Sequence, residues 1–307
     1  MQKYVIALDV GGTSVKSGIV DDSFSVPDGF REEHPALSGQ NRQDILENFL
    51  WIIETHLQKL KGLESRIDGI GLAFPGPFDY EKGICYNTGI GKFESIYGVN
   101  VGQWLKRELA GRSRFAAVQK VPLIFMNDAA AFALGEFHAG KGKGSGRGAY
   151  ITLGTGCGST FLERDRIVKG EYGIPEEGYI FHMPYKDSVV DDYLSKRGFL
   201  NIAREHGFDT EKFDVRDIAL LARDGNSRAK ASYHAFGRMM GEILKLYVLP
   251  FKPEVLVIGG GISRGYDLFA EGILQEPGME DLRIEVSSRL DISAMIGIAG
   301  CFFKGTE

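Results

Sequence analysis

The sequence contains few cysteines and no long apolar segment. Its three cysteines, Cys85, Cys157 and Cys301, are far apart and odd in number. This spacing excludes a disulfide framework and a cysteine-rich metal site, and it favours a reducing cytoplasm. No apolar stretch approaches the roughly 20 residues that span a bilayer. The apolar run that Asp9 ends is also too short for the core of a signal peptide, so we expect a cytoplasmic protein without a membrane segment.

An excess of positive charge is also missing. The formal net charge is −5 at pH 7, so no overall basic field would attract nucleic acid. The length of 307 residues predicts about two domains, and 43% hydrophobic residues are ordinary for a globular chain. We therefore expect a globular protein that does not bind nucleic acid.

Apolar strands alternate with helical patterns along the chain, which predicts an α/β fold. The main helices are expected at about 41–61, 101–109, 228–248 and 293–303. A strand–glycine–strand pattern near the start, LDVGGTSVKSGIV, returns near the middle as ITLGTGCGSTFL. Two copies of one unit indicate two related halves facing a cleft.

The two glycine–threonine turns are the first candidate ligand sites. Glycine lets backbone N–H groups approach phosphate oxygens, and Thr13 and Thr155 add hydroxyl donors. Asp9, before the first turn, could hold a hydrated Mg²⁺, and Lys16 is the nearest cation in the sequence. The alternative is a pair of tight hairpins that serve turn geometry alone.

An Asn127–Asp128 pair follows the predicted strand VPLIFM. Ligands gather at strand ends in α/β sheets, and the Asp128 carboxylate could accept a proton from an attacking hydroxyl. An aspartate before an alanine-rich helix is also a good N-cap. Both roles can hold together.

Two later segments are further candidates. GGGIS after the strand VLVI suits a backbone that passes close to a base or ribose, or else a simple turn. Glu176, Glu177 and His182 combine carboxylate and imidazole, which suits recognition of vicinal hydroxyls. A histidine in such a loop can equally be structural.

Together, these segments resemble the ROK family of sugar kinases and sugar-responsive repressors over the full chain. LDVGGTSVKSGIV and ITLGTGCGST are similar to its two phosphate motifs, and VLVIGGGIS to its adenosine motif. FMNDAAAFALGE is similar to its catalytic segment, and GLAFPGPFD followed by Asn87 to its sugar-side loop. The resemblance implies an actin/hexokinase-like fold of two ribonuclease-H-like domains with a central cleft. We expect one domain at 1–120, completed by a helix at about 292–307, and the other at 121–291.

The resemblance also implies roles for individual residues, with Asp128 as the catalytic base. The sugar-side residues are expected to be Gly76, Asn87, Asn127, Glu177, His182 and Asp191. The residues near the nucleotide are expected to be Asp9, Gly11, Gly12, Thr13, Lys16, Thr155, Gly156, Gly260 and Gly261. ATP and Mg²⁺ are the implied cofactors, with Mg²⁺ held by Asp9 through water. Dimers are common in the family, so a homodimer is an open possibility.

The chain departs from the family pattern at two places. Many members carry a glutamate–x–glycine–histidine motif, but extra residues here separate His182 from the glutamates, of which we favour Glu177 over Glu176. The usual cysteine-rich zinc motif is replaced by MPYKDSVVDDYLSKRG, which has no cysteine, so no zinc site is expected. DDYLS in this stretch places Asp191 at the family's second sugar-binding glutamate.

The expected reaction is ATP-dependent phosphorylation of a hexose, with glucose the first candidate, on its primary hydroxyl. The matched motifs offer little fixed positive charge, which favours a neutral sugar over a sugar acid. The alternatives are an N-acetylhexosamine kinase, a polyphosphate glucokinase and a sugar-binding protein without activity. A repressor is disfavoured because only eight residues precede Asp9.

Overall fold

The computed structural model describes residues 2–89 and 91–303, and the chain forms two compact units. One unit comprises Met1–Ala139 with Asp291–Glu307, and the other Gly140–Leu290. The boundary therefore lies after residue 139 and not near 120, because the strand and helix that follow residue 120 pack into the first unit. No helix among the described residues has both the length and the apolarity that crossing a membrane requires.

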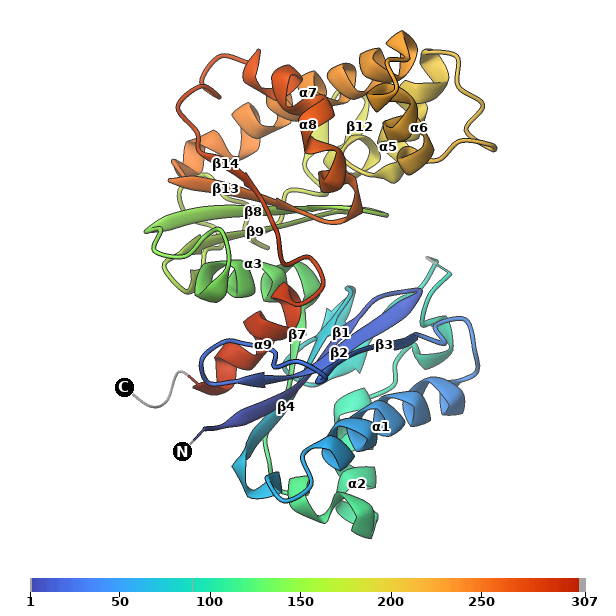
Figure 1. Ribbon diagram of the computed structural model, residues 1–307, viewed down its shortest axis with the longest axis vertical. Helices are drawn as coiled ribbons and strands as arrows, with labels where there is room; N and C mark the ends of the chain where they lie inside the picture. The colour runs from blue at the N-terminus through green and yellow to red at the C-terminus, as the bar shows by residue number, and fades with distance from the viewer. Residues whose placement is uncertain (1, 90, 304–307) are drawn as a thin grey trace. The chain divides into compact units, whose positions relative to one another are not determined.

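The first unit is built on a five-stranded sheet with the order β3-β2-β1-β4-β7 (Figure 1). Strands β1, β4 and β7 run parallel, and β2 and β3 add an antiparallel edge. The bounds are β1 Tyr4–Val10, β2 Ser14–Asp21, β3 Arg31–Pro35, β4 Ile67–Phe74 and β7 Leu123–Asn127. A small hairpin, β5 Phe78–Asp79 with β6 Ile84–Cys85, follows β4.

Helices cover both faces of this sheet. Helices α1 (Arg42–Lys59) and α2 (Val101–Gly111) share an apolar core with one face, and α3 (Asp128–Ala139) and α9 (Ser293–Phe303) share a second core with the other. The side chain of Asn41 caps α1 by accepting a hydrogen bond from the Asp44 N–H at 3.1 Å. The expected helices near 41–61, 101–109 and 293–303 are confirmed.

Small residues allow α3 and α9 to approach each other very closely. A Cβ atom placed at Gly135 would fall 1.8 Å from the carbonyl oxygen of Ser293, and one at Gly297 would fall 1.8 Å from that of Ala131. Only glycine fits at either position, so these contacts fix α3, which follows the Asn127–Asp128 pair, against α9.

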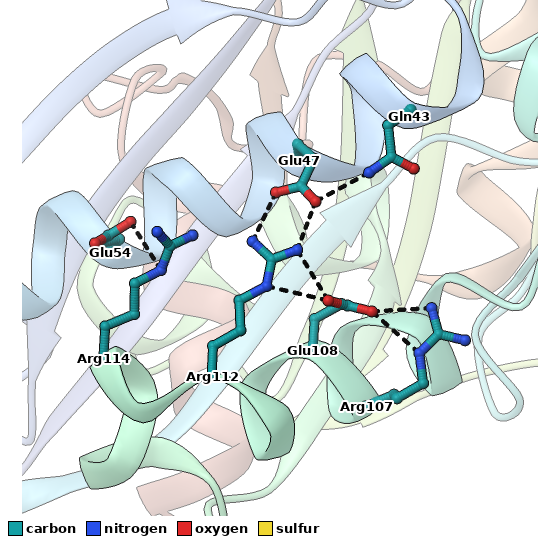
Figure 2. A network of polar contacts seen from close by, with 7 residues as sticks. All are labelled: Gln43, Glu47, Glu54, Arg107, Glu108, Arg112 and Arg114. Atoms are coloured by element: carbon teal, nitrogen blue, oxygen red, sulfur yellow. Dashed lines mark hydrogen bonds and ion pairs between the residues drawn. The ribbon is translucent and has the colours of Figure 1, made fainter.

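A polar network holds α2 against α1 on the outside of the first unit (Figure 2). The Arg112 guanidinium donates to both Glu47 carboxylate oxygens, at 2.9 and 2.6 Å, and to Glu108 at 2.9 Å. Glu108 also accepts from Arg107. Bidentate pairs in a network contribute more than isolated surface pairs, so this network supports the packing of the two helices.

The second unit repeats the sheet of the first, with the order β10-β9-β8-β13-β14. Strands β8 and β9 form an antiparallel hairpin, and β8 then pairs in parallel with β13, as β1 does with β4. The repeat seen in the sequence thus corresponds to equivalent positions in two sheets. The bounds are β8 Arg147–Leu153, β9 Cys157–Glu163, β10 Arg166–Ile167, β13 Val255–Gly259 and β14 Ile284–Val286.

Helices pack on one face of this second sheet and form its main core. The long helix expected at about 228–248 is confirmed as α7. The helices are α4 Val190–Tyr193, α5 Lys196–Glu205, α6 Val215–Arg223, α7 Ser227–Tyr247 and α8 Tyr266–Leu274. A small hairpin, β11 Pro184–Tyr185 with β12 Ser188–Val189, occupies the stretch where the family's zinc motif was expected to be missing.

Candidate active site

In the first unit, parallel strands bring two carboxylates to one edge of the sheet. Asp9 pairs with Ala73 on β4, and Ala73 pairs with Met126 on β7. Asp9, one residue before the end of β1, is therefore separated by β4 alone from β7, the strand that leads into Asp128. Burial, and then the negative charge of Asp128, raise the pKa of Asp9 to about 6. The sequence alone gave no reason to pair these two residues.

Asp128 lies at the start of α3, directly after β7. Burial raises the pKa of its carboxyl group, although the side chain keeps some exposure to solvent. Its Oδ1 accepts one hydrogen bond, from the Ala129 N–H at 2.9 Å. A carboxylate whose pKa lies above the ordinary value holds a proton more readily, as a base that activates a hydroxyl must.

Asn127, and not Asp128, caps helix α3. The Asn127 Oδ1 accepts from the Ala130 N–H at 3.1 Å, and its Nδ2 donates to the Tyr80 hydroxyl at 3.1 Å. Asp128 is the first residue of the helix. The reading of Asp128 as the N-cap is therefore wrong, because the preceding amide fills that role.

The first glycine–threonine turn lies between β1 and β2. The Gly11 N–H donates to the Ser14 carbonyl at 2.9 Å, which closes the turn. A Cβ atom at Gly12 would fall 2.2 Å from Cδ and 2.8 Å from Nζ of Lys92. Lys92 thus brings an ammonium group to the turn, whereas Lys16 pairs with Asp291 at 3.0 Å.

Asn87 supports the sugar-side loop from beneath. It is fully buried, and in the amide orientation that suits its neighbours its nitrogen donates to the carbonyls of Pro77 at 2.9 Å and Gly76 at 3.1 Å. Gly76 itself is exposed. These contacts make Asn87 a residue that shapes the loop, and its direct contact with a sugar stays a prediction.

A carboxylate holds the second glycine–threonine turn. Asp191 Oδ1 accepts from the Cys157 N–H at 2.7 Å, and a Cβ atom at Gly156 would fall 2.8 Å from the same oxygen. Thr155, at the tip of the turn, is exposed. Glycine at 156 is therefore required by the close approach of Asp191.

A pocket of about 600 Å³ opens beside this turn within the second unit. Gly154, Thr155 and Gly261 from the predicted motifs line it. Side chains that the sequence did not indicate complete it, with cations at Lys196, Arg216 and Arg223 and apolar groups at Val215, Leu220 and Tyr233. Cations next to apolar walls suit a phosphorylated ligand with a planar base, and the volume lies in the range of cofactor sites.

Gly260, which precedes the pocket residue Gly261, packs against the end of β8. Its φ of 81° is in the left-handed region, and a Cβ atom there would fall 2.3 Å from the Leu153 carbonyl oxygen. The Lys196 N–H donates to the Gly154 carbonyl at 2.8 Å, which brings the start of α5 to the turn. The backbone of GGGIS therefore packs directly against the strand that leads into the second glycine–threonine turn.

Glu177 and His182 lie together in the second unit. Glu177 Oε2 is 3.5 Å from His182 Nε2, and both side chains are exposed. Glu176 instead turns towards Gly170, where a Cβ atom would fall 2.6 Å from its Oε2. This arrangement favours Glu177 over Glu176 as the partner of His182.

The chain carries four predicted motifs along its two sheets. In order, they are the first glycine–threonine turn, the Asn127–Asp128 pair, the second glycine–threonine turn and the glycine turn after β13. The model of the ROK family matches residues 5–302. The chain belongs to the ROK family. The predicted family and the predicted actin/hexokinase-like fold are confirmed.

ROK proteins of known name match most of the chain. A glucokinase of Halalkalibacterium halodurans is 28% identical over 300 residues, which cover 89% of this chain and 84% of that protein. An N-acetyl-D-glucosamine kinase of Vibrio cholerae is 25% identical, over 86% of this chain and 85% of its own. The crystal structure of a ROK family glucokinase from Streptomyces griseus in complex with glucose and AMPPNP matches with a TM-score of 0.71 at 18% identity. That match covers 98% of this chain and 100% of the other.

The motifs of the sequence did not indicate the site residues that lie outside them. Lys92 lies in the segment after Asn87 and offered no signal except its charge. The pocket residues on α5, α6 and α7 follow no spacing that a motif would show. The first turn therefore has more positive charge nearby than the matched motifs alone supply, because Lys92 lies against Gly12.

Proposed function

We propose that this ROK protein is a sugar kinase that transfers the γ-phosphoryl group of ATP to the primary hydroxyl of a hexose, with glucose the first candidate. The observation that carries the proposal is Asp128, a carboxylate with a raised pKa at a strand end beside Asp9. The names of the glucokinase and N-acetylglucosamine kinase relatives agree with a sugar as acceptor.

In this mechanism, Asp128 takes the proton of the sugar hydroxyl as its oxygen attacks the γ-phosphorus. The new P–O bond forms as the bond to the leaving ADP oxygen breaks, and the products are a sugar phosphate ester and ADP. Such a transfer depends mainly on positioning and on stabilising charge. The fixed position of Asp128 at the start of α3 meets the first need, because α3 is held by its close contact with α9.

Each turn has groups that suit phosphate oxygens. Lys92 supplies positive charge at the first turn, and Thr13 and Thr155 supply hydroxyl donors. The 600 Å³ pocket of the second unit would hold the nucleoside. Because Lys92 belongs with the donor phosphates in this scheme, a neutral sugar remains the proposed acceptor.

Asp9 would hold Mg²⁺ through water. Burial, and then the negative charge of Asp128, raise the pKa of Asp9, while the positive charge of Lys16 lowers it. A hard dication with oxygen ligands fits such a carboxylate. When bound, Mg²⁺ supplies positive charge that offsets the charge of the phosphates.

A coupled assay with a panel of acceptors tests the proposal. Glucose, mannose, fructose, N-acetylglucosamine and N-acetylmannosamine are compared by kcat/KM, each with ATP and with polyphosphate. We expect the highest value for glucose with ATP. A higher value for an N-acetylated sugar would replace glucose as the proposed acceptor, and a higher value with polyphosphate would replace ATP as the proposed donor. No turnover with any pair would reject the kinase in favour of a sugar-binding protein.

A further inference from the structure

Three potential metal ligands meet in the first unit, away from the residues proposed for catalysis. Glu32 and His34 lie on β3, and His56 lies near the end of α1. Residues two apart on a strand point to the same face. One ligand atom from each of the three side chains lies within 4.8 Å of the other two.

The ligand atoms of this cluster lack ordinary partners. His34 and His56 are 9% and 0% exposed. Among the described residues, Glu32 Oε2, His34 Nε2 and His56 Nδ1 are buried without a hydrogen-bond partner, although the first two atoms are 3.3 Å apart. A buried polar atom left unpaired is costly, and three in one place indicate a ligand that accepts their lone pairs.

The other polar atoms of these side chains are held in place. His56 Nε2 lies 2.8 Å from the buried Ser17 hydroxyl, and this bond leaves Nδ1 as the nitrogen that can carry the free lone pair. Glu32 Oε1 pairs with Lys59 Nζ at 2.7 Å, which leaves Oε2 for another partner. The Trp51 and His34 rings form a T-shaped pair, with centroids 4.9 Å apart. Such supporting contacts orient the ligands of metal sites.

We propose that Glu32, His34 and His56 form a binding site for a divalent transition-metal ion, with Zn²⁺ as the best match. Two imidazoles and one carboxylate are a common zinc ligand set that leaves a fourth position for water. The 3.3 Å between Glu32 Oε2 and His34 Nε2 equals the separation of about 3.3 Å between two ligands of one tetrahedral zinc. The Glu32 side chain is 24% exposed, although its Oε2 atom is buried.

The ligand set also separates this site from the proposed Mg²⁺ position at Asp9. Mg²⁺ prefers oxygen ligands, whereas imidazole nitrogen suits zinc and its neighbours in the transition series. The positive charge of Lys59 repels a metal ion bound nearby, so we expect micromolar affinity. A bound ion would tie the edge strand β3 to α1. The expectation of no zinc site rested on the cysteine-free stretch after His182, and it did not consider residues that only the fold brings together.

Titration of the full-length protein with ZnCl₂ tests the site. The protein is first stripped with a chelator and dialysed, and MgCl₂ is then present in excess so that carboxylates near Asp9 are not counted. We expect one Zn²⁺ per chain by calorimetry. Co²⁺ in its place should give the visible absorption of a low-coordinate cobalt centre. Absence of saturable binding by the unmodified protein would overturn the proposal.

Matched variants locate the ion. Glu32→Gln and His34→Gln should each weaken Zn²⁺ binding by about 100-fold, and Ser17→Ala, which touches no ion, by about 10-fold or more. His234→Gln, a histidine of the second unit, should bind as the unmodified protein does. Unchanged affinity in both Glu32→Gln and His34→Gln would reject the site. If His34→Gln fails to fold in a metal-free melting test, Glu32→Gln and Ser17→Ala decide the question.

Discussion

The two glycine–threonine turns have similar sequences and equivalent places in their sheets, but the side chains that lie against their glycines carry opposite charges. At the first turn, the cationic side chain of Lys92 lies against Gly12. At the second, the anionic side chain of Asp191 lies against Gly156 and accepts a hydrogen bond from the Cys157 N–H. A repeated motif therefore does not imply a repeated role, because the residues that contact each turn come from unrelated segments.

The residues beside the two turns also differ. Beside the first turn, Asp9 and Asp128 are two carboxylates with raised pKa values. Beside the second, backbone and side-chain groups are paired, as the Lys196 N–H with Gly154 shows. We infer that the first region is arranged for reaction and the second for binding. Changes in the first should therefore alter kcat or stability, and changes in the second should alter KM.

Asp128→Asn is expected to have the largest effect and to test the first region. Loss of the base should lower kcat by about 10²–10⁴, or roughly 3–5 kcal/mol. The melting temperature should hardly change, because Asn127 caps α3 in either case. Steady-state kinetics and a melting curve measure both. Asp68→Asn, which removes one surface ion pair, is the matched control, and normal turnover of Asp128→Asn would disprove the assignment.

Glu177→Ala tests whether the second unit also binds the sugar. Loss of a hydrogen bond from a charged group to a substrate hydroxyl should raise the KM for sugar by about 10- to 100-fold. The KM for ATP should stay the same. Glu176→Ala is the control, since Glu176 points towards Gly170. An equal rise in both KM values would instead indicate a structural role for the loop.

Asp9→Asn should increase stability while it removes activity. Because the folded protein raises the pKa of Asp9 from 3.8 to about 6, Asp9 favours the folded state below pH 3.8, and this contribution is lost as the pH rises through 6. Asparagine avoids that loss, so the variant should be more stable by about 2 kcal/mol above pH 7, after allowance for solvent screening. Melting curves with EDTA from pH 4 to about pH 8 should diverge as the pH rises. Parallel curves would contradict the assigned environment of Asp9.

Lys92→Met compares the two lysines considered for the first turn, Lys92 and Lys16. Removal of the ammonium that lies on Gly12 should weaken ATP use by about tenfold, seen as a lower kcat/KM for ATP. Lys16→Met should have a smaller effect, because Lys16 pairs with Asp291. If Lys16→Met weakens ATP use more than Lys92→Met does, Lys16, the nearest cation in the sequence, would be the better candidate for the phosphate ligand.

Two substitutions of Asp191 give the smallest expected effects and examine the second turn. Asp191→Asn keeps an oxygen that can accept from the Cys157 N–H, so the KM for ATP should stay near normal. Asp191→Ala leaves that N–H unpaired and should raise the KM about 3- to 10-fold. If both variants instead lose affinity for sugar alone, Asp191 acts as the sugar ligand that the family resemblance implied.

The sequence predicted the fold well because the fold depends on local patterns. The strands, the main helices and the repeated hairpins follow from apolar periodicity and glycine turns. The division after residue 139 was missed, because the pairing of β7 with β4 joins segments about 50 residues apart. The cap at Asn127 was missed because two adjacent residues could each fill the position.

The site was predictable where motifs are continuous and unpredictable where side chains converge. Asp9 and Asp128 were each identified, but their effect on one another depends on the order β1-β4-β7. Lys92 on Gly12, and Glu32 with His34 and His56, are contacts between distant segments. Such contacts are set by packing and leave no spacing rule in a single sequence.

The close fit of α9 onto α3 also constrains the order in which the chain can fold during synthesis. The first unit needs Ser293–Phe303 for the core on one face of its sheet, and the ribosome makes these residues only after the entire Gly140–Leu290 unit. The second unit is continuous, so it can complete its core while the chain is still being extended. At about 5–20 residues per second, the strands β1 to β7 wait many seconds with that face uncovered. The unit that is synthesised first is thus the last to be completed, and this interval is when it would most need a chaperone.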